Sequence, residues 1–154
     1  MGKNPTDRGK IGTKRSLLTD GGGVPIGLAV EGANRNDFKM ARETIESIPV
    51  ERPEPAADHP QGMCLDKGYD YNEVRDLLAE FRCTAHIRAR GEEAKALKQE
   101  TGFKARRWVV ERTHSGMNRF RRVLIRWDKK VRNDLAFLHL ACAYITFRQS
   151  GLLG

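Results

Sequence analysis

Asp66 is an acidic residue at a position where a carboxylate can act as a metal ligand. It directly follows the short apolar run Met63-Cys64-Leu65, which is typical of a buried strand. Ligand sites of α/β sheets are built at the carboxyl ends of strands, which favours a functional role. An Asx-type turn with the following Lys67-Gly68-Tyr69 explains the same aspartate equally well. From the residues alone, both interpretations remain open.

Glu111 stands in the most basic part of the chain. Between residues 104 and 132 there are eight arginines and three lysines, against two acids, Glu111 and Asp128. An ion pair with Arg107, one helical turn back, contributes a few tenths of a kcal/mol and is the simpler explanation. A carboxylate among guanidinium groups is also held ionised, as a metal ligand must be. Residue chemistry alone therefore favours the ion pair over the ligand.

The same segment predicts a long helix from Lys104, with a second helix after Asn133. Apolar side chains recur at helical spacing and form one continuous stripe that is expected to face the core. The stripe consists of Val110, Thr113, Met117, Phe120, Leu124 and Trp127. Four arginines, Arg112, Arg119, Arg122 and Arg126, then lie on the flanks. A solvated charged face is the plain alternative, but a one-signed, arginine-rich flank favours phosphate contact.

The rest of the chain predicts short elements of both kinds in the order β-β-α-β-α-β-α-α, which is mixed α/β. Residues 1–12 are expected to form a loop, and 13–32 a hairpin around Gly21-Gly22-Gly23. A helix is predicted over 37–48, capped by Asn36 or Asp37, and a proline-rich surface loop over 49–61. Strands are expected at 63–65 and 83–87, helices at 71–81 and 91–101.

Composition limits the possible functions. The chain has 154 residues, a net charge of +8 and a pI near 9.7, which favours a polyanionic partner. Cys64, Cys83 and Cys142 show no CxxC spacing and lie among apolar neighbours, which predicts reduced core thiols rather than disulfides or zinc ligands. No apolar segment is long enough for a membrane span or resembles a signal peptide. These features predict a cytoplasmic protein.

The ordered set of motifs resembles DDE transposases of bacterial insertion sequences, closest to the insertion-sequence-five type. The resemblance rests on Asp66-Lys67-Gly68-Tyr69-Asp70 and on Trp108-Val109-Val110-Glu111-Arg112-Thr113-His114-Ser115, continued by Asn118-Arg119-Phe120-Arg121-Arg122. It extends over nearly the whole chain, through Gly12-Thr13-Lys14-Arg15-Ser16, Gly32-Ala33-Asn34-Arg35-Asn36-Asp37 and the ending Leu138-His139-Leu140-Ala141-Cys142.

The resemblance implies an RNase H-like mixed sheet with flanking helices, in which three carboxylates hold two Mg²⁺ (or Mn²⁺) ions. Two such ions activate water or a 3′-hydroxyl and stabilise the leaving oxygen of a phosphodiester. Asp66 then corresponds to the second carboxylate and Glu111 to the third. Arg107 and Arg112 correspond to basic positions of the signature, expected to orient phosphates or to offset transition-state charge. The resemblance reverses the preference for a simple ion pair at Glu111.

Two departures from the family pattern matter. Gly116 stands where the motif more often carries Trp, and a mid-helix glycine costs about 1 kcal/mol relative to alanine. The family's first catalytic aspartate lies on a central strand before the segment that opens here at Met1. Asp7 and Asp20 lie in loops and Asp37 suits a helix start, so none replaces it.

We therefore expect one partial catalytic domain over 1–154 (loop 1–12, hairpin 13–32, central strands and helix 62–88, C-terminal helices 104–149). Without the first strand two apolar edges stay unpaired, so good folding is expected to require an upstream segment.

The leading hypothesis is a transposase catalytic fragment that cleaves and joins DNA at transposon ends, with the first aspartate supplied from upstream. The partners expected are double-stranded DNA, both transposon ends and target, a second copy in a homo-oligomer, and an upstream-frame polypeptide, all in the bacterial cytoplasm at the nucleoid. The alternative is a catalytically inactive DNA-binding fragment that regulates or competes with the full-length enzyme. A stand-alone RNase H-like nuclease is the weaker third hypothesis, because the first ligand is missing.

Overall fold

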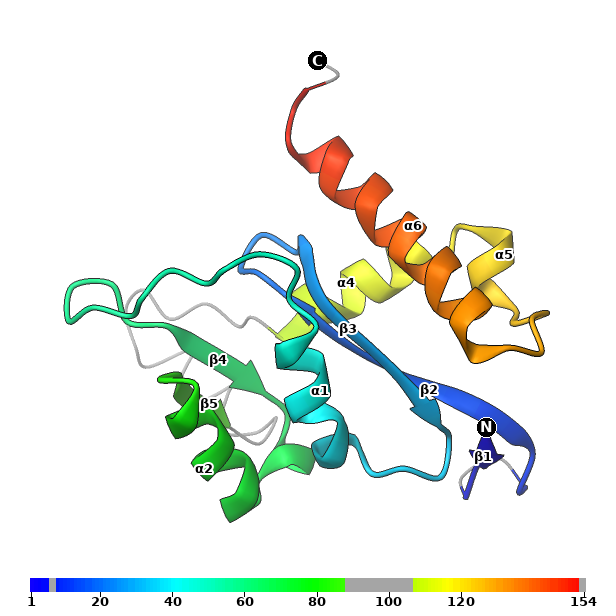
Figure 1. Cartoon of the computed structure of the whole chain (residues 1–154), viewed down its shortest axis with the longest axis horizontal. Coiled ribbons are helices and arrows are strands. Elements are labelled where there is room, and N and C mark those ends of the chain that lie inside the picture. The colour runs from blue at the N-terminus through cyan, green and yellow to red at the C-terminus, as the bar shows by residue number, and fades with distance from the viewer. Residues whose placement is uncertain (6–7, 88–106, 153–154) are drawn as a thin grey trace. The chain divides into compact units, whose positions relative to one another are not determined.

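A computed structural model describes residues 1–5, 8–87 and 107–152, together forming a mixed α/β protein (Figure 1). Its elements are β1 (Gly2–Lys3), β2 (Ile11–Thr19), β3 (Pro25–Gly32), the 3-10 helix η1 (Asp37–Met40), α1 (Ala41–Glu46), β4 (Gly62–Leu65), the 3-10 helix η2 (Lys67–Tyr69), α2 (Asn72–Glu80), β5 (Thr84–Ile87), α4 (Arg107–Met117), α5 (Arg121–Leu124) and α6 (Val131–Gln149). The chain divides into two compact units, Met1–Pro49 with Val109–Gly154 (unit 1) and Val50–Trp108 (unit 2).

Unit 1 is built on the antiparallel sheet β1-β2-β3. Strands β2 and β3 pair from Thr13 opposite Gly32 to Thr19 opposite Pro25, which confirms the predicted hairpin. The carboxylate of Asp20 closes the turn by accepting hydrogen bonds from the backbone N–H groups of Gly22 and Val24, both at 2.8 Å. Within the segment expected to be a loop, the two residues of β1 add a short pairing to the start of β2.

Helix α1 packs closely against β3 because Gly27 has no side chain. A Cβ atom at this position would lie 2.4 Å from the backbone oxygen of Thr44 in α1. The hydroxyl of Ser47, just beyond the helix, accepts a hydrogen bond from the N–H of Leu28 at 2.7 Å. Asn36 occupies the N-cap position of η1, one of the two positions predicted, but its side chain makes no cap hydrogen bond. Asp37 lies in the first turn of η1 and pairs with Lys14 at 3.2 Å.

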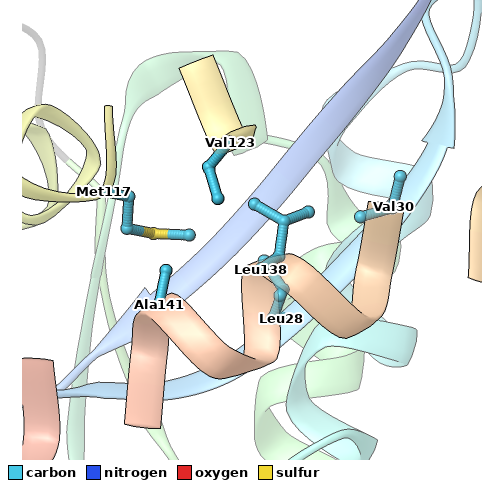
Figure 2. Close-up of a cluster of buried hydrophobic side chains, with 6 residues drawn as sticks. All are labelled: Leu28, Val30, Met117, Val123, Leu138 and Ala141. Carbon is cyan, nitrogen blue, oxygen red and sulfur yellow. The ribbon is translucent and has the colours of Figure 1, made fainter. Parts of the chain in front are cut away.

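The core of unit 1 forms where β3 meets the C-terminal helices. Leu28 and Val30 of β3 pack with buried side chains from α4, α5 and α6. Figure 2 shows this cluster, which also contains Met117, Val123, Leu138 and Ala141. Leu138 is fully buried, so the middle of α6 is fixed against the sheet by apolar burial.

The long helix expected from Lys104 was wrong, because the chain breaks it after Met117 and ends it at Leu124, whereas the second helix, expected after Asn133, is present as α6. Helix α4 ends at Met117, α5 covers only Arg121–Leu124, and α6 begins at Val131. Phe120 has an extended backbone (φ −81°, ψ 108°), which interrupts the helical period. As a result Val123 takes the buried position that the stripe assigned to Leu124, and Trp127 lies outside the core.

Unit 2 contains a β4-α2-β5 arrangement with a parallel strand pair. Parallel pairing runs from Gly62 opposite Thr84 to Leu65 opposite Ile87. Three of the apolar residues predicted for the helix, Val74, Leu77 and Leu78, are buried in α2 as expected. The predicted helix at 91–101 lies outside the described residues.

The proline-rich segment before β4 is tied to unit 2 by Arg52. Its guanidinium donates hydrogen bonds to the side-chain oxygen of Gln61 and to the backbone oxygen of Phe81, both at 3.0 Å. It also lies 5.4 Å from the centre of the Phe81 ring. The loop predicted at 49–61 is therefore ordered by a side chain of its own.

The prediction of three core cysteines was wrong for Cys64. Its side chain is exposed, whereas those of its neighbours Met63 and Leu65 are half-buried. Successive strand residues point to opposite faces, so a short apolar run need not be buried throughout. Cys83 and Cys142 are partly buried, and none of the three forms a disulfide. In the described part of the chain, no helix is long and apolar enough to cross a membrane.

Candidate active-site carboxylates and basic residues

Asp66 immediately follows β4, at the carboxyl end of the parallel pair. Its side chain is exposed, and one carboxylate oxygen accepts a hydrogen bond from the N–H of Gly68. This bond caps η2, so the Asx-type turn exists. The turn fixes the carboxylate at the strand end that the ligand interpretation requires, and the two interpretations are therefore compatible.

The second acidic residue of this motif, Asp70, has a separate structural role. Its carboxylate pairs with the guanidinium of Arg75 in the first turns of α2, at 2.6 Å. The pair draws Asp70 toward α2, whereas Asp66 stays with the strand end. The two aspartates of the motif are thus distinguishable by their contacts.

Glu111 lies on α4, and its side chain is exposed. The two residues that follow Glu111 hold α4 to the turn of the β2–β3 hairpin. The hydroxyl of Thr113, which is buried, donates a hydrogen bond to the backbone oxygen of Gly23 at 2.8 Å. The guanidinium of Arg112 donates to the backbone oxygen of Gly22 at 2.7 Å. The hairpin turn therefore sets where Glu111 is presented.

His114, the next residue of the motif, lies on the inward side of α4. Burial lowers the pKa of its imidazole below 6.5, and the positive charge of Arg15 lowers it further. Arg15 itself donates a hydrogen bond to the backbone oxygen of Val123, at the end of α5. A neutral imidazole is therefore favoured on this face of the helix.

The predicted phosphate-binding arginines fall into different environments. Arg112 contacts the hairpin turn, as described above. Arg119 lies exposed in the turn after α4. Arg122 is half-exposed, pairs with Asp128 at 3.1 Å, and lies over the Phe137 ring. The side chain of Arg107 lies outside the described residues, so its ion pair with Glu111 stays a prediction.

Arg126 differs from the other arginines because its side chain is only 12% exposed. Its Nε donates to the backbone oxygen of Asp128 at 2.8 Å, and its Nη2 donates to that of Lys129 at 3.2 Å. Asp134, buried in α6, places a carboxylate oxygen 3.8 Å from Nε. The contacts of Arg126 are thus internal ones, and it offers less to a phosphate than Arg119 does.

The two carboxylates lie in different units: Asp66 in unit 2 and Glu111 in unit 1. Over residues 1–5, 8–87 and 107–152, no three His, Cys, Asp or Glu side chains are grouped so that they could hold a metal ion. Asp20 and Asp37 are engaged in the hairpin turn and with Lys14, respectively. Asp7 lies outside the described residues.

Comparison with known proteins identifies the family. A model of the transposase DDE domain matches residues 2–146 of this chain. The chain belongs to the transposase DDE family. The members of this family are metal-dependent phosphoryl-transfer enzymes, and the resemblance inferred from the motifs is confirmed.

Two curated relatives are encoded by insertion sequences. A putative transposase for insertion sequence element IS402 of Burkholderia cepacia is 36% identical over 150 residues, covering 94% of this chain and 67% of the relative. A putative transposase for insertion sequence element IS6501 of Brucella ovis is 23% identical over 137 residues, covering 88% of this chain and 98% of the relative. No solved structure matches the chain.

The sequence patterns of this transposase domain missed one contact and one exposed side chain. The Thr113 hydroxyl, which joins α4 to the hairpin, was assigned only to an apolar stripe. Trp127 was placed on the same stripe but is exposed. The sequence signal for a fixed loop around Trp127 is two pairs of oppositely charged residues, Arg122 with Asp128 and Arg126 with Asp134.

Proposed function

We propose that this transposase chain is the part of a catalytic domain that cleaves and joins DNA strands at the ends of an insertion sequence. The observation that carries the proposal is the position of Asp66. The carboxylate stands directly after a parallel strand of a β-α-β unit and is oriented by an Asx-type turn, the location where α/β sheets build ligand sites. Membership of the DDE family supplies the reaction class.

In this proposal Asp66 and Glu111 are metal ligands. Both side chains are exposed, and both offer the hard carboxylate oxygens that Mg²⁺ or Mn²⁺ prefers. Two bound ions supply an activated water or 3′-hydroxyl and stabilise the leaving oxygen. The hydrogen bond from Gly68 orients Asp66, and the contacts of Thr113 and Arg112 with the hairpin turn position Glu111.

A third carboxylate and a further strand complete the proposed site. In an RNase H-like sheet this strand pairs with both β2 and β4. Among the described residues, β2 pairs with β3 along Thr13–Thr19, and its pairing with β1 involves only Ile11 and Gly12. Strand β4 pairs with β5. An upstream segment, in the same polypeptide or from an overlapping frame, would supply both the strand and the first aspartate.

The basic residues are proposed to bind the phosphates of transposon-end and target DNA. Arg119 is exposed just before α5, Arg122 is half-exposed on α5, and Arg112 follows Glu111 directly. Arg107 is expected to act beside them. Transposition joins two ends, so the active complex is proposed to be a homo-oligomer working on the nucleoid in the bacterial cytoplasm. Neutralising several phosphates makes such binding strongly salt-dependent.

The catalytic proposal is tested by strand cleavage with matched variants. The chain is combined with the upstream segment and with a labelled duplex carrying the terminal repeats of its own element, in Mg²⁺ or Mn²⁺. Asp66→Asn and Glu111→Gln are expected to abolish cleavage and retain binding, because each removes a charge and little volume. Asp70→Asn is the matched control, since Asp70 lies in the same turn but pairs with Arg75. Cleavage by the two variants at the wild-type rate would refute the assignment.

The alternative function is a DNA-binding fragment that regulates or competes with the complete enzyme. The observation in its favour is that Asp66 and Glu111 belong to different units, with no third acidic residue grouped with either in the described ranges. This alternative predicts salt-sensitive DNA binding without product at any metal concentration, even when the upstream segment is present.

A further inference from the structure

The loop between α5 and α6, residues 125–130, exposes a large aromatic side chain. Trp127 is 69% exposed, and Ile125 before it is 54% exposed. Tryptophan has the largest side chain and buries a large apolar area when another group packs against it. An exposed tryptophan therefore offers a large apolar face for a contact with another molecule.

Trp127 points outward because the residues on both sides of it are held by hydrogen bonds and an ion pair. Before it, the nearly buried guanidinium of Arg126 donates hydrogen bonds to the backbone oxygens of Asp128 and Lys129. After it, the carboxylate of Asp128 pairs with Arg122, whose guanidinium lies 4.9 Å from the centre of the Phe137 ring on α6. Exposure of Trp127 therefore follows from a fixed loop conformation.

The exposed charged side chains between residues 119 and 132 are all positive. Asp128 and Asp134 are the acids of the segment, and their side chains are only 12% and 2% exposed, each next to an arginine. The exposed cations of the loop and its flanks are Arg119, Arg121, Arg122, Lys129, Lys130 and Arg132. Lysine is depleted at protein–protein interfaces, whereas lysines beside an aromatic are the pattern of a nucleic-acid contact, with cations for the phosphates and a ring for the base.

We propose that Trp127 stacks on an unpaired DNA base while Lys129 and Lys130 contact the neighbouring phosphates. The inference rests on the proposed function, because it takes DNA as the substrate. Bases within an intact duplex present no free face to an incoming ring, so the ligand is a base at a gap, a nick or a frayed end. Strand cleavage produces such ends, and the loop is therefore assigned to cleaved DNA rather than to continuous duplex.

The test uses the full chain and two labelled duplexes of one sequence, one fully paired and one with a short single-stranded gap. Trp127→Ala is expected to weaken binding to the gapped duplex by about 5- to 150-fold, the contribution of one stacked base. Binding to the paired duplex stays nearly unchanged. Trp127→Phe retains most of the preference, because it keeps a ring. Leu140→Ala is the matched control, since Leu140 is an equally exposed apolar residue on α6.

A second measurement reports the contact directly. The chain contains two tryptophans, so Trp108→Phe leaves Trp127 as the sole tryptophan fluorophore. Its emission is expected to be quenched by the gapped duplex and much less by the paired one. Lys129→Ala and Lys130→Ala should each lower the slope of log affinity against log salt by about 1 on both duplexes. The two kinds of variant thus separate base contact from phosphate contact.

Three results would overturn the inference. In the first, Trp127→Ala weakens binding to both duplexes equally. In the second, Trp127→Ala binds both duplexes like the wild type but sediments differently, which would assign Trp127 to a protein contact. In either case salt-sensitive DNA binding by the wild type leaves the proposed transposase function standing. Absence of wild-type binding to either duplex would remove the inference together with the proposed DNA contact by this chain.

Discussion

Gly23 is the point where the turn of the β2–β3 hairpin meets α4, and Gly23→Ala tests whether this turn supports the helix that carries Glu111. The glycine is buried and has a φ of +91°, a region that L side chains rarely adopt. An added Cβ would lie 3.2 Å from the Thr113 hydroxyl and 3.3 Å from a Val109 methyl carbon. Both distances are tighter than ordinary packing, and Thr113 is the residue that hydrogen-bonds to this turn.

The expected loss of stability combines two costs. The left-handed backbone costs an alanine about 1–2 kcal/mol, and crowding in a packed region adds about 1–3 kcal/mol. We expect Gly23→Ala to lower the free energy of unfolding by about 2–5 kcal/mol, measured by urea denaturation followed by circular dichroism and tryptophan fluorescence.

Gly21→Ala, in the same turn, is the control for this experiment. A Cβ at Gly21 meets no heavy atom within 4 Å, so a change within about 0.5 kcal/mol is expected. Equal unfolding midpoints for the two variants would refute the idea that the hairpin turn and α4 support each other. A selective loss in Gly23→Ala, with reduced cleavage in the complete system, would link the turn to the position of Glu111.

Three further predictions concern side chains near the core. His114 has a lowered pKa in the folded state, so below pH 6.5 the unfolded state binds more protons. Stability should then fall as the pH decreases through this range, by at most about 1.4 kcal/mol per pH unit, and His114→Gln should flatten the dependence measured by thermal melting. Burial raises the pKa of the Cys142 thiol to about 11, so its thiolate fraction at pH 8 is roughly 100-fold smaller than normal. Iodoacetamide should therefore label exposed Cys64 first by mass spectrometry, and equal labelling rates in the folded chain would contradict this. Gly116→Ala should stabilise the chain by about 0.5–1 kcal/mol in urea denaturation, because its Cβ would meet only Ile145, at an ordinary 3.9 Å; a loss of stability would show that this space is not available.

The sequence by itself predicted most of the elements and identified the family. Alternating and helical apolar patterns predicted the hairpin, the β4-α2-β5 unit and the burial of Val74, Leu77 and Leu78, because local periodicity decides which face of an element is apolar. The motifs around Asp66 and Glu111 identified the family, since spacing along the chain is sufficient for that. The catalytic roles of both residues remain proposals.

Only the tertiary structure decided where the helical pattern stops and which side chains remain outside the core. The sequence from 104 to 132 fits one helix well, yet extended Phe120 breaks it, and Val123 is buried in place of Leu124. The physical reason is that the residue buried in the core is chosen by its packing partners, which for Val123 are Leu138 and the strand residues of β3. Periodicity does not contain that information. The exposure of Trp127 follows from the same break, so the proposed DNA contact becomes visible only in the folded chain.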